Sequence, residues 1–298
     1  MQTVCGAGRG LIPTCAAALL FLGAPGATEP VPRQDAQSSG TSLERGLVYA
    51  RPGGRELRAD VRRPAGDGPH PGVLVVHGGS WSRGSRSRMR GISERLAQAG
   101  YAAVSVDYRL APQHRFPAQI HDCKAAVRWM RGNAGELRLD PDRIGGFGYS
   151  SGAHLVALLA TTAPADGLEG VPAGEALSSR IQAAVLGGAP TDLRRFPPNT
   201  VVRRFLGGGP DELPSVYALA SPITHVSADD SPIFLYHGTR DLVVDVSHAR
   251  RMAEALREAG VPHQLREADF GHAATFLWDG DEVDDAIRFL DQWLGAQP

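Results

Sequence analysis

The sequence is poor in lysine, cysteine and aromatic residues, and it has no surplus of charge of either sign. Its 298 residues carry a formal net charge of -1, so the excess of basic groups that phosphate binding requires is missing. This balance argues against nucleic acid as a partner. The hydrophobic share of 42% and the charged share of 21% are typical of a globular protein, and the length fits one α/β domain preceded by a leader.

Long hydrophobic runs are also missing. The apolar stretch near the N-terminus runs from Cys15 to Leu22, far short of the ~20 residues that span a bilayer. The basic residue Arg9 precedes this stretch and the small residues 23–27 follow it, which is the layout of a signal peptide. We therefore predict a signal peptide over residues 1–27, export of a bacterial protein to the periplasm or the cell exterior, and no stable membrane insertion.

The scarcity of cysteine bears on stability. Removal of such a leader takes away Cys5 and Cys15 and leaves Cys123 as the only cysteine. An intramolecular disulfide is then impossible, so we expect the hydrophobic core to stabilise the fold. The only lysine, Lys124, follows this cysteine directly.

A linker and one domain account for the rest of the chain. Residues 28–42 are rich in Pro, Gln, Ser and Gly, which predicts a flexible linker, and the catalytic domain is expected over residues 43–298. Two extended segments, residues 43–50 and 56–63, flank the turn signal Arg-Pro-Gly-Gly of residues 51–54. They predict an antiparallel hairpin at the edge of a sheet.

Beyond this hairpin, short apolar runs alternate with longer amphipathic stretches. This alternation predicts a doubly wound α/β fold, with a mostly parallel central sheet and helices on both faces. The runs expected to form strands are residues 73–77, 102–107, 143–147, 183–186, 233–237 and 264–268. The stretches expected to form helices are residues 87–99, 117–131, 151–161, 246–259 and 282–293. The alternation fails at about residues 190–222, where we expect a small insertion lying over the sheet.

Ser150 lies in the segment Gly148-Tyr149-Ser150-Ser151-Gly152, between a predicted strand and a predicted helix. A serine nucleophile at such a sharp turn needs small residues on both sides, and the two glycines supply them. The turn exposes the hydroxyl group and directs helix N–H groups at the charge that forms on attack. The simpler alternative is a glycine-rich turn with N-capping serines and no catalysis.

A second motif, His-Gly-Gly-Ser-Trp at residues 77–81, directly follows a predicted parallel strand. In an acyl-transfer enzyme, the backbone N–H groups of such a loop bind the oxyanion, and each donor contributes about 10²- to 10³-fold in rate. We expect the N–H groups of Gly78, Gly79, Ser80 and Ser151 to form this oxyanion hole. Standing alone, the same motif would be a simple turn between a strand and a helix.

A serine nucleophile also needs a histidine base that is oriented by a carboxylate. His272 follows the last predicted strand and Asp241 follows the strand before it, so both lie at the edge where a parallel sheet gathers its site. Asp245, in the same loop as Asp241, is an alternative acid, and Asp269 is a further one that is very close in sequence to His272. Four further histidines beyond the serine are at less suitable positions: His225, His237, His248 and His263.

On these motifs the sequence resembles the α/β-hydrolase serine esterases, the group related to hormone-sensitive lipase and including bacterial carboxylesterases and acetyl esterases. The resemblance runs from about Leu43 to the C-terminus, and the segments Asp-Tyr-Arg-Leu-Ala-Pro at residues 107–112 and Phe-Pro-Ala at residues 116–118 belong to it. It implies a structural role near the site for residues 107–112.

The resemblance also implies the chemistry of the site. Ser150 would be the nucleophile, His272 the general base and acid, and Asp241 the carboxylate that orients the histidine, with no metal and no organic cofactor. The oxyanion loop departs from the lipase-like pattern, because Ser80-Trp81 stands where those enzymes usually have another glycine. This departure favours a neighbouring subgroup that includes acetyl and feruloyl esterases of plant polysaccharides and the arylformamidases.

We therefore predict a serine esterase that hydrolyses carboxylic esters with short acyl groups through an acyl-enzyme intermediate. The expected substrate is a small molecule or an ester linked to a polysaccharide. An arylformamidase-type amidase is the alternative among enzymes, and a non-catalytic binding protein on the same fold is the alternative from another class. The oligomeric state stays open.

Overall fold

The computed structural model describes residues 40–170, 177–197, 200–272 and 281–295. The predicted signal peptide of residues 1–27 and nearly all of the predicted linker lie outside these ranges. Among the helices in the described residues, none has the length and apolar composition needed to cross a bilayer.

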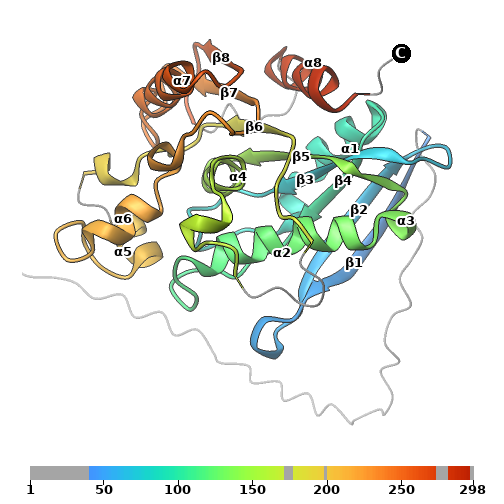
Figure 1. Cartoon of the computed structure of the whole chain (residues 1–298), viewed down its shortest axis with the longest axis horizontal. Helices are drawn as coiled ribbons and strands as arrows, with labels where there is room; N and C mark the ends of the chain where they lie inside the picture. Colours follow the sequence, from blue (N-terminus) through green and yellow to red (C-terminus); the bar gives the residue numbers. More distant parts are fainter. Residues whose placement is uncertain (1–39, 171–176, 198–199, 273–280, 296–298) are drawn as a thin grey trace, which may run out of the picture. The chain divides into compact units, whose positions relative to one another are not determined.

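The strands of the described residues form one eight-stranded sheet in the order β1-β2-β4-β3-β5-β6-β7-β8 (Figure 1). The strands are β1 Thr41–Ala50, β2 Leu57–Pro64, β3 His70–Val76, β4 Ala102–Val106, β5 Leu139–Tyr149, β6 Ala183–Gly187, β7 Ile233–Gly238 and β8 His263–Ala268. β2 is antiparallel to both β1 and β4, and the remaining neighbours are parallel. The predicted α/β-hydrolase architecture with an antiparallel hairpin at one edge is confirmed.

The first strand starts earlier than predicted. β1 begins at Thr41 rather than Leu43, because Thr41 and Ser42 pair with Pro64 and Arg63 of β2. A polar composition at the end of the linker does not prevent this pairing, since an edge strand needs backbone hydrogen bonds more than apolar side chains.

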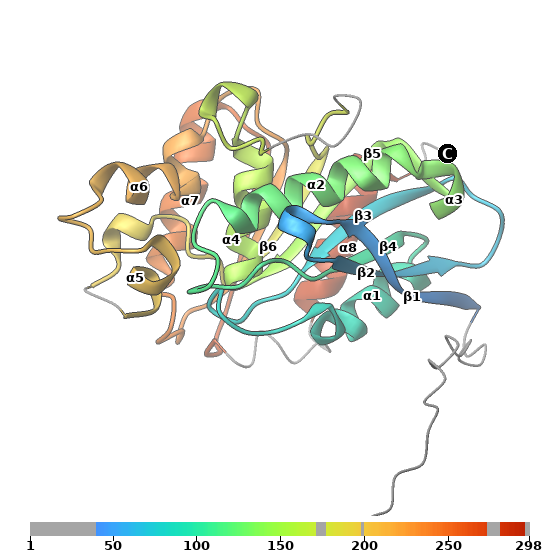
Figure 2. The same ribbon diagram turned by 90° about the horizontal axis from the view of Figure 1, so that it is seen from below.

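The helices are α1 Arg90–Gln98, α2 Ala118–Gly132, α3 Ala134–Leu137, α4 Ser151–Thr161, α5 Thr200–Leu206, α6 Pro214–Leu219, α7 Ser247–Ala259 and α8 Asp281–Leu294. Figure 2 shows α2 and α4 over one face of the sheet, with α1 and α8 over the other. The longer helices follow the predicted amphipathic stretches closely, and only the first differs much, because residues 86–89 form a 3-10 turn before α1.

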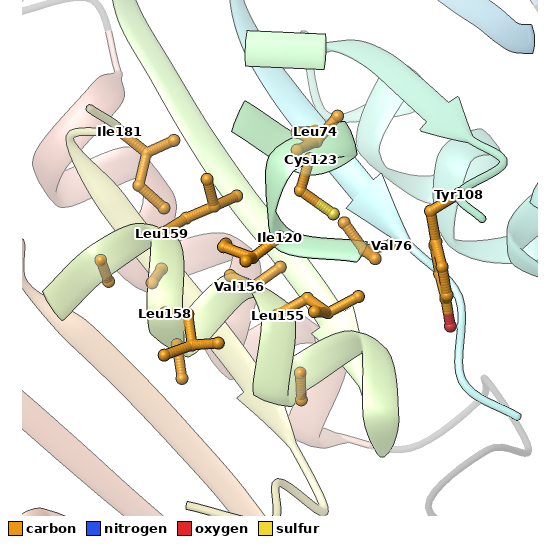
Figure 3. Packing of buried hydrophobic residues seen from close by; sticks show 14 of the residues in the cluster. Leu74, Val76, Tyr108, Ile120, Cys123, Leu155, Val156, Leu158, Leu159 and Ile181 are labelled. Carbon is orange, nitrogen blue, oxygen red and sulfur yellow. The ribbon is translucent and has the colours of Figure 1, made fainter. Parts of the chain in front are cut away.

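Side chains of β3 alternate between the two faces, as the period of a strand requires. Leu74 and Val76 belong to the larger core cluster, which α2 and α4 cover, whereas Val73 and Val75 belong to the cluster under α1 and α8. Figure 3 shows the larger cluster, where the side chains of β3 meet those of the two covering helices. β3 is therefore buried on both faces, which explains its continuous apolar sequence.

α2 buries both the only lysine of the sequence and its neighbouring cysteine. The Lys124 side chain is 1% exposed, and its ammonium group donates a hydrogen bond to the carboxylate of Glu169, which also pairs with Arg128. Burial lowers the pKa of Lys124, and the bond to Glu169 opposes this effect. Cys123 is a free thiol packed in the core. A buried ammonium is tolerated here because a carboxylate compensates its charge.

The region of residues 190–222 consists of short helical segments where it is described. They are a 3-10 turn at Leu193–Arg195, helices α5 and α6, and a 3-10 turn beginning at Pro222. Phe205 and Tyr217 of these helices are buried and belong to the larger core cluster. In Figures 1 and 2 the helices α5 and α6 lie on the side of α4 and α7, away from the hairpin of β1 and β2.

Candidate active site

The turn between β5 and α4 holds Ser150 in a strained backbone conformation. Its φ of 52° and ψ of -122° lie outside the regions that side-chain-bearing residues prefer, at a cost of about 1–3 kcal/mol. The surrounding backbone stabilises this conformation. The N–H group of Ser150 donates to the carbonyl of Gly187 at 2.7 Å, and its carbonyl accepts the N–H group of His154 at 3.0 Å.

The glycines on both sides of the serine are steric requirements. A Cβ atom on Gly148 would lie 2.5 Å from the carbonyl oxygen of Gly152. A Cβ atom on Gly152 would lie 2.1 Å from the carbonyl oxygen of Val76, at the end of β3. A larger residue at either position would force the turn that carries Ser150 to move, so the structure explains why glycines stand two residues before and two residues after the serine.

Three predicted side chains meet at the carboxyl ends of β5, β7 and β8. The Nε2 atom of His272 lies 3.0 Å from the Oγ atom of Ser150, and its Nδ1 atom lies 2.6 Å from the Oδ2 atom of Asp241. Since a carboxylate only accepts hydrogen bonds, Nδ1 carries the proton and Nε2 is free to accept the serine hydroxyl. This arrangement has the geometry of a nucleophile, a base and an orienting acid.

The alternative acids have other partners. Asp245 accepts the backbone N–H group of Ser247 at 2.9 Å, as a residue before a helix does, and α7 begins there. Asp269 pairs with Arg240, with 2.6 Å between Nε and Oδ1. Of the three carboxylates considered, Asp241 is the one in contact with His272.

The carboxylate of Asp241 is completely buried, with 0% of its side chain exposed. Burial by itself raises the pKa of Asp241, but hydrogen bonds from His237, from His272 and from the Val244 N–H group outweigh it and hold the pKa below its usual range. The group therefore stays ionised beside His272, as the stabilisation of an imidazolium requires.

The loop that carries His272 is anchored beside the serine turn. The hydroxyl group of Tyr149, the residue before the nucleophile, donates a hydrogen bond to the carbonyl of His272. Gly188 follows β6 with a φ of 56°, and a Cβ atom there would lie 3.3 Å from Cε1 of His272. The sequence motif alone assigns no role to Tyr149. Its position directly before the nucleophile is the one feature of the sequence that could have indicated this contact.

The loop after β3 lies against the serine, as predicted for an oxyanion hole. A Cβ atom on Gly78 would be 3.2 Å from the Cβ atom of Ser150, and Gly79 has a φ of 132°. Ser80 follows in the left-handed region, with a φ of 56°. Ser151 is the first residue of α4, so its N–H group is one of those that a helix leaves without an intrahelical partner.

Trp81 fixes the end of this loop through contacts that the sequence does not reveal. Its indole N–H group donates to Nδ1 of His154 at 3.1 Å, and its ring stacks on Phe205 with 4.3 Å between the ring centroids. His154 in turn lies with Nε2 at 2.7 Å from the carbonyl of Ala220. Burial lowers the pKa of His154 to about 4, so it is neutral and can accept the indole proton.

The segment of residues 107–112 supports the same loop from the other side. The hydroxyl group of Tyr108 donates to the carbonyl of His77 at 2.9 Å, and the two rings stack. Asp107 accepts the N–H group of Arg86 at 2.8 Å, and the Arg86 guanidinium pairs with Asp60 at 2.7 Å. These contacts agree with the structural role that the resemblance implies for this segment.

Metal-binding residues do not gather elsewhere in the described ranges, where no group of three or more His, Cys, Asp or Glu residues could hold a metal ion. The described site itself brings together a serine, a histidine and a carboxylate.

The order of the strands and the strained serine turn define an α/β-hydrolase fold. The chain belongs to the BD-FAE family, whose model matches residues 60–256. This membership confirms the resemblance that the sequence motifs carry.

Several curated relatives are esterases. Esterase LipQ of Mycobacterium tuberculosis is 34% identical over 224 residues, which cover 70% of this chain and 52% of LipQ. Esterase LipC of the same organism is 34% identical over 200 residues, which cover 63% of this chain and 49% of LipC. The chain spans about half the length of these curated relatives.

Solved esterase structures match over a larger share of their length. A truncated form of a carbohydrate esterase from gut microbiota superimposes with a TM-score of 0.80 at 25% identity, covering 87% of this chain and 99% of that one. The apo form of esterase 2 from Thermogutta terrifontis gives a TM-score of 0.74 at 27% identity, covering 89% of this chain and 99% of that one.

Proposed function

We propose that the protein hydrolyses carboxylic esters, with Ser150, His272 and Asp241 as its catalytic triad. The observation that carries this proposal is the continuous path of hydrogen-bonding distances, 3.0 Å from serine to histidine and 2.6 Å from histidine to aspartate. A binding protein without catalysis has no need for this path or for the strained serine turn.

His272 takes the proton of the Ser150 hydroxyl as the oxygen attacks the ester carbonyl. Asp241 stabilises the imidazolium that forms, and the N–H groups of Gly78, Gly79, Ser80 and Ser151 are proposed to stabilise the oxyanion. The tetrahedral intermediate collapses, His272 protonates the departing alkoxide, and an acyl-serine remains. Water that gives its proton to His272 then attacks the acyl group, and the carboxylic acid and the free serine are released.

Short acyl groups are the proposed substrates. Esterase 2 of Thermogutta terrifontis, 26% identical to this chain, has been solved with propionate bound and with butyrate bound, which supports small acyl groups for a similar site. The carbohydrate esterase among the similar structures supports an ester linked to a polysaccharide as one form of the substrate.

The test is the hydrolysis of short p-nitrophenyl esters by the wild type, by Ser150→Ala and by Ser215→Ala. Ser215 is an exposed serine of α6 and serves as the matched control. We expect Ser150→Ala to lower kcat by more than about 10⁴-fold and Ser215→Ala to keep the wild-type rate. Turnover retained by a folded Ser150→Ala variant would overturn the proposal.

Covalent labelling tests the nucleophile independently of turnover. The Thermogutta terrifontis esterase has also been solved phosphorylated by paraoxon. We expect paraoxon to add one diethyl phosphoryl group to this protein at Ser150, as measured by mass spectrometry of the intact protein and of its peptides. Modification at another serine would contradict the assignment.

Parallel rates on N-formylkynurenine and on acetate esters separate an esterase from the arylformamidase alternative.

Export is a separate proposal that rests on the sequence alone. We propose that residues 1–27 form a signal peptide and that the mature protein is periplasmic or extracellular. Expression in a bacterial host, cell fractionation and N-terminal sequencing test this proposal. An intact Met1 on protein found only in the cytoplasm would contradict it.

A further inference from the structure

A second histidine, besides His272, lies against the carboxylate of the proposed triad acid. His237 lies near the end of β7 and is fully buried, with 0% of the residue exposed. Its Nε2 atom lies 2.8 Å from the carbonyl oxygen of Val244 and 3.4 Å from Oδ2 of Asp241. Because both oxygens only accept hydrogen bonds, Nε2 carries the proton and points between them.

The tip of the turn that holds Asp241 is exposed, whereas Val244 at the end of the turn is buried, with 4% of the residue exposed. Leu242 is 99% exposed and Val243 is 61% exposed, so the tip of the turn contributes almost nothing to the core. Within the turn, the carboxylate accepts the N–H groups of Val243 at 2.8 Å and Val244 at 2.9 Å. These bonds fix the shape of the turn, and the N–H group of Asp241 donates to the carbonyl of Gly238 at the end of β7 at 3.2 Å.

The side chain of His237 adds a second connection between β7 and the turn, at Val244. Its backbone belongs to the parallel ladder with β8, in register with Glu267, so the ring projects from a rigid strand. The ring bridges the first and the last residue of the turn, Asp241 and Val244, through one N–H group. The other nitrogen, Nδ1, is buried and has no hydrogen-bond partner in the described residues. Of the two ring nitrogens, only Nε2, which faces the turn of Asp241, makes a hydrogen bond in the described residues.

We propose that His237 is a positioning residue of the triad, which holds the Asp241 carboxylate in register with His272 by donating its Nε2–H group to the turn of residues 241–244. This inference rests on the proposed esterase function. His237 is buried and does not touch the serine in the structure, so it acts through Asp241 and takes no part in proton transfer. Small displacements of a catalytic group cost up to about 10²-fold in rate, which sets the scale of the effect.

The experiment compares His237→Gln with His237→Asn. A glutamine side chain carries its amide N–H group about where Nε2–H lies, whereas asparagine carries it near the Nδ1 position, short of Val244. His263→Gln, at the opposite end of the neighbouring strand β8, is the control. The readouts are kcat and KM for p-nitrophenyl acetate, normalised to active sites, and the urea unfolding curve of each variant.

We expect His237→Asn to lower kcat by about 10- to 100-fold with KM changed less than about twofold. His237→Gln should recover kcat to within about threefold of the wild type, and His263→Gln should match the wild type. Equal kcat values for the two His237 variants would overturn the inference, because the position of the side-chain N–H donor would then have no effect on the rate. A wild type without esterase activity would instead refute the proposed function, so the two failures are distinguishable.

Discussion

Acidification should destabilise the domain strongly, because three histidines are buried in their neutral form. Burial lowers the pKa of His77, His154 and His248 from the usual 6.5 to about 4. Between these two values the unfolded chain binds more protons than the folded protein does, so the free energy of unfolding falls as the pH drops. This contribution is fully present above pH 6.5 and is lost progressively on the way to about pH 4.

The size of the effect follows from these pKa values. Between about pH 7.5 and about pH 5, each histidine lowers the free energy of unfolding by about 2 kcal/mol, and the three together lower it by about 6 kcal/mol. The free energy of unfolding of a whole domain is about 5–15 kcal/mol, so the domain should be close to its unfolding transition at the lower pH.

Urea unfolding followed by circular dichroism at both pH values measures this loss. His154→Gln and His248→Gln should each reduce the difference between the two pH values by about 2 kcal/mol. The cost of each substitution itself is present at both pH values and cancels in this difference. If both variants lost as much stability on acidification as the wild type, the buried neutral histidines could not be the cause.

Three further predictions concern the site. Asp241→Asn should lower kcat for ester hydrolysis by about 10³- to 10⁴-fold, whereas Asp245→Asn should stay within about twofold; equal losses would contradict the choice of acid. Gly152→Ala should abolish activity and lower the urea midpoint, because the added Cβ would lie 2.1 Å from a carbonyl oxygen at the end of β3; a fully active variant would show that the turn can relax. Trp81→Phe keeps an aromatic ring but leaves Nδ1 of His154 without its donor, so kcat/KM should fall about tenfold and thermal stability should fall with it; unchanged kinetics would remove Trp81 from the support of the oxyanion loop.

The serine turn could be predicted from the sequence because its requirements are local. Gly148 and Gly152 stand at fixed distances from Ser150 along the chain, and each is needed for a close backbone approach. The parallel strands were predictable for a similar reason, since burial on both faces gives continuous apolar runs such as Val73–Val76. Close backbone approach thus selects glycine, and burial on both faces selects apolar residues, so both features can be recognised in the sequence.

The choice of the acid depends on a contact that no local pattern contains. Asp241 and Asp245 lie in one loop and offer the same chemical group. The position of His272 distinguishes them. Because β7 pairs with β8, the Nδ1 atom of His272 lies 2.6 Å from the Oδ2 atom of Asp241. Strand order favoured Asp241, but only the three-dimensional arrangement separates it from the residue that precedes α7.

The stacking of Trp81 on Phe205, which supports the oxyanion loop, could not be predicted from the sequence. Phe205 reaches Trp81 from a region whose short helices show no regular period, and the stacking joins residues far apart in sequence. His237 was considered only as a competing base, because a histidine near a strand end has the residue type of a catalytic group. Its contact with Asp241 supports the positioning role proposed above instead.

The burial of Lys124 has a practical consequence for anyone who wishes to attach a probe. It is the only lysine in the sequence, its side chain is 1% exposed, and Glu169 binds its ammonium group. Amine-reactive dyes and resins should therefore couple to the α-amino group of the folded protein. Cys123 is equally protected from thiol reagents. In the protein without the predicted leader, a cysteine in place of an exposed residue such as Leu242 would then label only the turn of residues 241–244, and the native Cys123 could stay.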